Sequence, residues 1–323
     1  VRAWGVWGRT ADVARRPANW FGREGTGACF AYEQALGRCD QTELQVFAPL
    51  DDPASIPFAG RAVGAVGAQA DASVRGATVH IRGSWDVDRG VLAVPEFEEG
   101  ASAEPPDGRV RRSADVGVAF DPRERLRVLA SLAITDGRVD RPFDGNDFAG
   151  IHPAGLLGFA EGGAEADFGY RLFRPSQVYG RDLSQEWTRW RAATNTTFEW
   201  TPGLRSGLVL GFERTTRRDL QMVPPGLIGL GSELPRGIAD RNRTVLGSGT
   251  ARLTTDATWD TSWGGGSTGV YAELWSSDFD REDRGGVGLP AGGGTVEDAE
   301  DRSSFDLDGE RRIAAVGVRQ GLD

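Results

Sequence analysis

The stretch TNTTFEWTPGLRSGLVLGFER, residues 194–214, contains two segments of alternating side chains joined at Thr201-Pro202-Gly203. Alternation with a period of two is typical of a strand that has one apolar face and one wet face. Proline and glycine at the junction are typical of a tight turn. The stretch therefore predicts a β-hairpin. One face carries Thr194, Thr196, Phe198, Trp200, Leu204, Leu208, Leu210 and Phe212, and the other carries Asn195, Thr197, Glu199, Arg205, Gly207, Gly211 and Glu213.

Similar segments recur along the chain, whereas helical periodicity is nearly absent. No stretch keeps apolar residues at i, i+3, i+4 and i+7 over three turns, and the 46 glycines interrupt almost every window. We therefore expect an all-β chain of ten strands. They lie near 2–9, 61–71, 75–86, 109–120, 125–135, 187–200, 204–215, 243–261, 268–279 and 310–319.

The connections between these strands alternate between long and short. The long ones cover 10–60, 87–108, 136–186, 216–242 and 280–309, and the short ones cover 72–74, 121–124, 201–203 and 262–267. In an up-and-down antiparallel sheet, consecutive connections emerge at opposite ends, so one end carries tight turns and the other carries large loops. This polarity is typical of outer-membrane barrels, which have short periplasmic turns and long extracellular loops.

The apolar faces could meet lipid or cover the core of a soluble sandwich. In segment 125–135 the apolar series is Leu126, Val128, Ala130, Leu132 and Ile134, and Arg125, Arg127 and Ser131 lie opposite. A sandwich would place turns every 8–12 residues, so the long loops argue against it. The strand lengths fit the roughly 9–11 residues that a tilted transmembrane strand needs to cross a bilayer. Aromatic residues near strand ends predict interfacial girdles, formed by Trp187, Trp190, Trp200, Trp259, Trp263 and Trp275.

These patterns predict a partial transmembrane β-barrel: up-and-down, antiparallel, about ten strands of a larger barrel, with long extracellular loops. The alternative is a secreted β-sandwich that acts as a binding module or adhesin. No run of about twenty apolar residues exists, which excludes a helical membrane protein.

The charge and the residue usage exclude several functions. The net charge is −10, which disfavours nucleic acid as a partner, because phosphate binding needs a basic patch. All 37 basic residues are arginine, so no P-loop lysine, Schiff-base lysine or serine–lysine dyad exists. A carboxylate pair for glycoside cleavage would need a separation in space that the sequence does not show. We expect a protein that is not an enzyme and that binds no cofactor.

Cys29 and Cys39 are the only cysteines. Two cysteines so close in a glycine-rich, aromatic segment predict a disulfide that closes a small loop, and with it an oxidising compartment. Two unrelated reduced thiols are the alternative. A metal site would need more cysteine or histidine ligands nearby.

Other candidate sites have plainer interpretations. Gly265–Gly269 matches G-x-S-x-G, but it precedes a strand rather than a helix, which indicates a hairpin turn. His80 is expected on the polar face of a strand, and His152 in a solvated loop. The glycine-rich piece 226–231 is interpreted as a loop. Loop aromatics either line a ligand path or hold the loops together: Trp20, Phe21, Phe143, Phe148, Tyr170, Phe173 and Tyr179.

The segment 278–310 is strongly acidic. Asp278, Asp280, Glu282 and Asp283 resemble part of a calcium loop, but Asp283 stands where the EF-hand pattern requires glycine. We interpret this segment as a solvated extracellular loop and leave calcium as the alternative.

Three pieces of the chain resemble TonB-dependent outer-membrane receptors of the SusC/RagA type. They are CFAYEQALGRCDQTELQVFAPLDDPASIPF (29–58), IRGSWDVDRGVL (81–92) and DVGVAFDPRERLRVLASLAITDGRVDRPFDGND (115–147). The run from Trp187 to Thr215 also follows the family's pattern. The resemblance covers roughly residues 20 to 315, and its motifs are loose patterns of strands and loops.

The resemblance implies nutrient uptake without catalysis, in the outer membrane of a Gram-negative-type bacterium. Such receptors hold a plug domain inside a 22-stranded barrel, and a motif before the plug contacts the TonB complex. A SusD-like surface lipoprotein often delivers an oligosaccharide or a peptide. We therefore expect residues 1–323 to be part of a single barrel domain, without the plug domain and the C-terminal strands. Outer-membrane lipid would contact the apolar faces.

Overall fold

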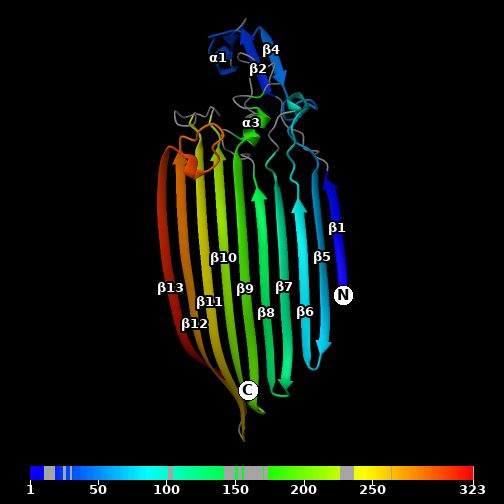
Figure 1. Ribbon diagram of the computed structural model, residues 1–323, viewed down its shortest axis with the longest axis vertical. Coiled ribbons are helices and arrows are strands. Elements are labelled where there is room, and N and C mark those ends of the chain that lie inside the picture. Colours follow the sequence, from blue (N-terminus) through cyan, green and yellow to red (C-terminus); the bar gives the residue numbers. More distant parts are fainter. Residues whose placement is uncertain are drawn as a thin grey trace.

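The computed structural model describes residues 1–10, 19–24, 27–29, 31–100, 105–141, 150–151, 155, 170, 174–225, 236–262 and 264–322. Its main feature is one sheet of ten antiparallel strands, each paired with the next along the chain (Figure 1). The strands are β1 (Arg2–Thr10), β5 (Arg61–Val74), β6 (Ala77–Asp88), β7 (Gly108–Arg123), β8 (Leu126–Asp140), β9 (Asp182–Thr201), β10 (Leu204–Val223), β11 (Ile238–Thr261), β12 (Gly264–Val287) and β13 (Asp301–Leu322). This is the architecture of a partial up-and-down β-barrel, as the sequence predicts.

The ten predicted strands are all present, but most of them extend further toward the long loops. The segment predicted at 310–319 is β13 (Asp301–Leu322), and the segment predicted at 187–200 is β9 (Asp182–Thr201). The added residues are mostly polar on both faces, so their sequence shows no clear alternation. The backbone ladder continues through them without a break, which keeps them extended.

The tight turns lie at one end of the sheet. Between β5 and β6 the turn is formed by Arg75 and Gly76, whose φ angles are 47° and 80°. A two-residue turn with positive φ at both positions matches the twist of the flanking strands. The sequence placed this turn at 72–74, but those residues remain in β5, paired with β6 up to Val74–Ala77. Pro202-Gly203 forms the turn between β9 and β10 as predicted, with Gly203 at φ 86°.

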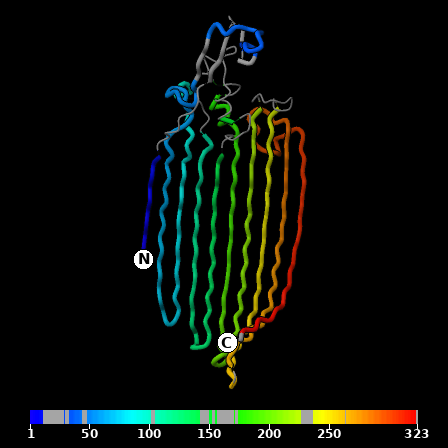
Figure 2. The backbone as a smooth tube through the Cα atoms, turned by 180° about the vertical axis from the view of Figure 1, so that it is seen from behind, coloured from blue at the N-terminus to red at the C-terminus, as the bar shows by residue number. Residues whose placement is uncertain are grey.

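The opposite end carries the long connections (Figures 1 and 2). They contain a small sheet of β2 (Asn19–Glu24), β3 (Gly27–Ala28) and β4 (Glu43–Phe47), with short helices α1 (Ala31–Ala35) and α3 (Pro175–Tyr179). The described residues of these connections also form two 3₁₀ turns, η1 (Glu96–Glu98) and η3 (Val296–Asp298). None of the helices in the described ranges is long and apolar enough to cross a membrane.

The strand register assigns every side chain to one of two faces, because successive residues point to opposite sides. The face that carries Leu208 is called the apolar face, and the opposite face, which carries Val209, is called the polar face. Leu208 lies opposite Thr196 on β9 and Leu253 on β11, so all three share the apolar face. No second layer of described residues covers this face, and the sheet forms a single layer in both views (Figures 1 and 2). Its large side chains are exposed, including Leu208, Leu210, Phe212, Leu253, Leu274 and Val316.

The apolar side chains form a belt in the half of the sheet next to the tight turns. On β8 it runs from Leu126 to Ile134, and on β10 from Leu204 to Phe212. Trp85, Trp190 and Phe212 border this apolar belt toward the loops, and Phe120, Trp200 and Trp259 border it toward the turns. From Trp190 to Trp200 the strand rises roughly 33 Å, which at the tilt of a barrel strand is about 25 Å of height.

The aromatic borders correct one part of the sequence prediction. Trp190, Trp200 and Trp259 lie on the apolar face, but the register places Trp187 and Trp275 on the polar face. Trp187 packs there against Gly137, where an added Cβ would lie 2.2 Å from its ring. A count of tryptophans near strand ends does not separate the two faces, whereas the register does. Trp263 lies outside the described residues.

Candidate functional site on the polar face

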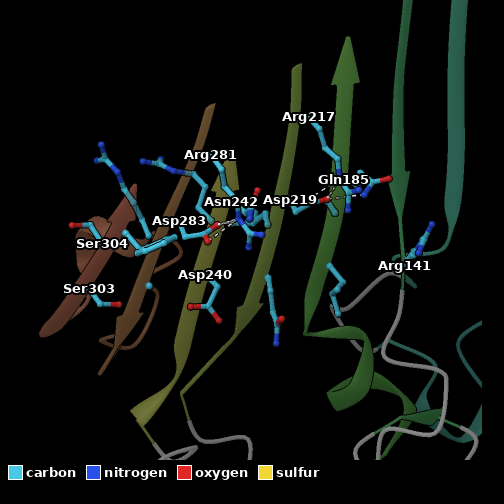
Figure 3. A pocket seen from close by; sticks show the side chains of 18 residues that line it. Arg141, Gln185, Arg217, Asp219, Asp240, Asn242, Arg281, Asp283, Ser303 and Ser304 are labelled. Atoms are coloured by element: carbon cyan, nitrogen blue, oxygen red, sulfur yellow. Dashed lines mark hydrogen bonds and ion pairs between the residues drawn. The ribbon is translucent and has the colours of Figure 1, made fainter. Parts of the chain in front are cut away.

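The polar face carries rows of hydrogen-bonding side chains in its loop-side half. One row runs directly across four strands, from Gln185 on β9 through Asp219 and Asn242 to Asp283 on β12. Because directly opposed residues have neighbouring Cβ atoms, side chains of this row can bond to one another. Figure 3 shows them pointing into a common hollow.

The first cluster in this row is centred on Asp219. Gln185 Nε2 donates to Asp219 Oδ1 at 2.7 Å, and Arg217 Nε donates to the same oxygen at 2.9 Å. Arg217 lies two residues from Asp219 on the same strand and therefore on the same face. The negative charge of Asp219 is thus neutralised by the Arg217 guanidinium, and the Gln185 amide holds the carboxylate in place.

The second cluster is centred on Asp283. It accepts hydrogen bonds from Asn242 Nδ2 and from Arg281 Nε, the latter at 3.1 Å. Thr244 Oγ1 donates at 2.9 Å to Asn242 Oδ1, which orients the amide so that its nitrogen faces Asp283. Both clusters repeat one arrangement: a carboxylate, an arginine two residues away on the same strand, and a cross-strand amide.

The hollow that these clusters line has a volume of about 610 Å³. Asp240, Gln221 and Ser303 also border it. Asp240 differs from the other two carboxylates, because no described residue donates a hydrogen bond to it or forms an ion pair with it. In Figure 3 it lies apart from the dashed contacts. It therefore offers a free negative charge beside prearranged amide and guanidinium groups.

This arrangement can bind a polar ligand. The carboxylates and amides of the two clusters are already held in place, so they can bind a ligand without first changing conformation. Together they offer acceptors and donors, which suits a polar ligand that has both kinds of group. An unpaired carboxylate attracts a cationic group. No three metal-ligating side chains converge in the parts of the chain that the structure describes.

Arginines and aromatic rings continue the polar face toward the tight turns. Arg189 Nη2 lies 2.7 Å from Glu213 Oε2 across β9 and β10. Arg252 lies over the ring of Tyr271 at 5.4 Å, and Arg311 over Trp275 at 5.9 Å. Charged groups therefore reach the height of the apolar belt behind this face, beside exposed apolar side chains such as Val209 and Ile313.

Three long connections pack together into a small core above the sheet. Its buried members are Leu50, Phe58, Ile151, Tyr170, Val178 and Tyr179. Tyr170 Oη donates to Ser55 O at 2.9 Å, and Tyr179 Oη donates to Ala93 O at 2.8 Å. Burial raises the pKa of the Tyr179 hydroxyl, so it remains a donor at all physiological pH values. We call this group the loop core.

The loop core settles one alternative for two of the aromatic residues. Tyr170 and Tyr179 hold loops together, because their rings are buried and their hydroxyls bond to the backbone of other connections. Glu98 adds a further tie, since it accepts hydrogen bonds from Ser176 N at 2.9 Å and Ser176 Oγ at 2.6 Å. Trp20 and Phe21 lie in β2, and Phe143, Phe148 and Phe173 lie outside the described residues.

His80 and the serine motif show no catalytic arrangement with other described residues. His80 is on the polar face as predicted, with Nε2 3.8 Å from Asp115 Oδ2 and its ring against Gly117. Gly265–Gly269 is extended strand within β12, whereas a nucleophile elbow needs a strand, a sharp turn and a helix. It is therefore strand rather than the hairpin turn that the sequence indicated. His152 and the segment 226–231 lie outside the described residues.

The acidic segment 278–310 is not a loop along most of its length, contrary to the sequence interpretation. Residues 278–287 continue β12, residues 301–310 belong to β13, and only 288–300 connects them. Asp278, Asp280 and Glu282 lie on the apolar face beyond the belt, and Asp283 lies on the polar face. An extended strand divides these carboxylates between two faces, so they do not wrap around one ion as a calcium loop does.

Cys29 and Cys39 form a disulfide, with a Cα–Cα distance of 5.9 Å. Cys29 is fully buried, and its carbonyl accepts a hydrogen bond from Gln41 Nε2 at 2.8 Å. The bond closes the short segment that contains α1 in the first long connection.

Comparisons with known proteins identify structures of the same fold. No family model and no curated protein matches the chain. Among solved structures, one titled "Structure of the RagAB peptide transporter" matches with a TM-score of 0.61 and 13% identity. The match covers 82% of this chain and 30% of that chain. A second, a RagAB peptide importer in the "closed-closed" state, matches with a TM-score of 0.58 and 13% identity over 82% of this chain and 31% of that one. The chain thus spans about a third of the length of these neighbours, and the likeness shows a shared fold.

Proposed function

We propose that the chain is part of the barrel of a TonB-dependent outer-membrane importer of the SusC/RagA type. The observation that carries this proposal is the uncovered apolar belt. Its height of about 25 Å and its aromatic borders match the lipid-facing band of outer-membrane barrels. A secreted sandwich or adhesin would cover such a face with a second layer. We therefore assign lipid to the apolar face and a watery interior to the polar face.

The remaining parts of the proposal follow from the same orientation. The tight turns face the periplasm and the loop core faces the exterior, where a SusD-like surface lipoprotein delivers the ligand. Residues 1–323 form part of one barrel domain, and a plug domain elsewhere in the full protein connects to the TonB complex. The disulfide agrees with an oxidising compartment outside the cytoplasm.

Among possible ligands we favour a peptide over an oligosaccharide. The hollow between β9 and β12 pairs its amides and arginines with carboxylates and leaves Asp240 without a described partner. A free carboxylate matches a peptide's amino terminus, whereas a neutral sugar offers no positive charge. The structural neighbours titled as peptide transporters agree with this choice.

The test uses cells that express the full-length protein. We expect it in the outer-membrane fraction, with mobility on gels that changes on heating. Labelled peptides should enter these cells, and an uncoupler that removes the proton-motive force should abolish uptake. Asp240→Asn should raise the peptide KM about two- to fivefold, the range of one exposed ion pair. Asp256→Asn is the matched control, because Asp256 is already paired with Arg319 at 2.8 Å. A full-length protein that purifies without detergent would refute the proposal.

A further inference from the structure

Five arginines gather on the apolar face at the loop-side border of the belt and just beyond it. They are Arg112, Arg138, Arg214, Arg218 and Arg243, from β7, β8, β10 and β11. Arg214 lies in the row of Trp190, Arg112 lies one row further toward the loops, and the other three lie two rows further. Arg112 is in a row with Asp136, Thr188 and Thr216, and Arg218 is in the next row with Glu186 and Arg138. We call this group the arginine patch.

A hollow of about 580 Å³ opens within the arginine patch. Its donors are the guanidinium groups of Arg112, Arg138 and Arg218 and the hydroxyls of Thr188 and Thr216. Four adjacent strands span about 14 Å, so the hollow is wider than a single phosphate. It lies directly beyond the row of Trp190, so a molecule whose chains lie on the apolar belt reaches it with its polar end.

The charges in the patch are only partly balanced. Arg138 forms ion pairs with Asp140 at 2.7 Å and with Glu186 at 3.3 Å. Asp136 accepts a hydrogen bond from Thr188 Oγ1 at 3.3 Å. Arg112, Arg214, Arg218 and Arg243 form no ion pair with any described residue. Arg218 and Arg243 are moreover directly opposite each other. Like charges in this position destabilise a sheet unless an anion lies between them.

The neighbouring strands carry the opposite charge at the same height. Asp278 lies opposite Glu310, Asp280 opposite Asp308, and Glu282 opposite Asp306, all on the apolar face. Among described residues, the two glutamates of this group have an arginine partner, Arg284 for Glu282 and Arg312 for Glu310, and the four aspartates have none. These strands repel an anion, so an anionic ligand is directed to β7–β11.

We propose that the arginine patch binds the phosphorylated headgroup of a lipid in the outer leaflet. The inference rests on the proposed membrane orientation, which places the patch at headgroup level above the apolar belt. Arginine forms bidentate hydrogen bonds with phosphate, and each basic residue near a charged membrane surface contributes to binding. Acyl chains on the belt and phosphates in the hollow would hold one lipid at two points. A free phosphate would use the hollow alone.

The test measures lipid binding by the full-length protein in detergent, by native mass spectrometry. The probes are lipid A with two phosphates, lipid A with both phosphates removed, and inorganic phosphate as a competitor. The variant is Arg112→Gln/Arg218→Gln. Arg127→Gln/Arg205→Gln is the control, because it removes the same charge from β8 and β10 on the polar face. Arg218→Lys tests whether charge alone is sufficient, and heat-dependent gel mobility confirms that each variant is folded.

We expect the phosphorylated lipid to bind more tightly than the dephosphorylated one. The patch variant should weaken that binding about fivefold for each arginine, while the control leaves it unchanged. Equal binding of both lipids, or equal loss in both double variants, would overturn the proposal. Displacement of the lipid by millimolar phosphate would overturn the assignment to a lipid headgroup. If the full-length protein is found in the outer membrane, these contrary results overturn only the lipid-binding proposal. If the protein is soluble, the proposed function is overturned as well.

Discussion

Leu208 and Val209 are adjacent on β10 and almost equally exposed, at 38% and 40%, but they lie on opposite faces. Leu208 is near the middle of the apolar belt, and Val209 faces the polar side. An arginine on the lipid-facing side of a barrel near the bilayer midplane costs about 2–4 kcal/mol, whereas one in the lumen costs little. Leu208→Arg should therefore lower the folding equilibrium constant by a factor of roughly 30 to 1,000. Val209→Arg should leave it nearly unchanged.

The assay is refolding of the full-length protein from urea into phospholipid vesicles, followed by tryptophan fluorescence and heat-dependent gel mobility. Each variant is titrated with denaturant until folded and unfolded forms are equal. Because the two sites share one strand and one exposure, local backbone effects cancel in the comparison. Equal destabilisation by both arginines, or none by either, would refute the assignment of the two faces.

Two further predictions concern the loops. Tyr179→Phe removes the hydroxyl that donates to the part-buried Ala93 O at 2.8 Å and to the buried Pro57 O at 3.3 Å. The loss of these bonds should cost the loop core about 1–3 kcal/mol, measured as faster hydrogen exchange in 89–100. Tyr271→Phe, whose hydroxyl bonds to no described residue, should not change it. Hydrogen bonds from Thr295 and from the Gly294 and Thr295 amides lower the pKa of Asp298. The stabilisation is therefore complete above the ordinary aspartate pKa and is lost as the pH falls through the lower folded value. Asp298→Asn should abolish this acid-dependent loosening of 288–300; loosening that persists in the variant would contradict the assignment.

The sequence predicts the number of strands and their order because the apolar belt imposes alternation on each of them. Leu204–Phe212 is recognisable as strand because the apolar residues Leu204, Leu208, Leu210 and Phe212 share one face. Beyond the belt both faces carry mostly polar residues, so the sequence predicts β12 and β13 too short and indicates a loop at 280–309. There the extended backbone is held by the ladder between neighbouring strands, which a single segment does not reveal.

The candidate site was not predicted for a related reason. Gln185, Asp219, Asn242 and Asp283 belong to four different strands and become neighbours only through the register. In the sequence each is one polar residue among many. The repeated spacing of arginine and aspartate, Arg217 with Asp219 and Arg281 with Asp283, is the one signal that the sequence contained. Two residues apart on a strand means the same face, which could have marked both clusters.

The most direct measurement of the central claim is the accessibility of spin labels along β10. Single cysteines placed from Leu204 to Phe212 in a Cys29→Ser/Cys39→Ser background of the full-length protein, in lipid bilayers, would each carry a nitroxide. Labels at Leu208 and Leu210 should collide mainly with oxygen, which dissolves in acyl chains, and labels at Val209 and Gly211 mainly with a water-soluble nickel complex. Uniform accessibility to the nickel complex at all positions would contradict a lipid-facing belt.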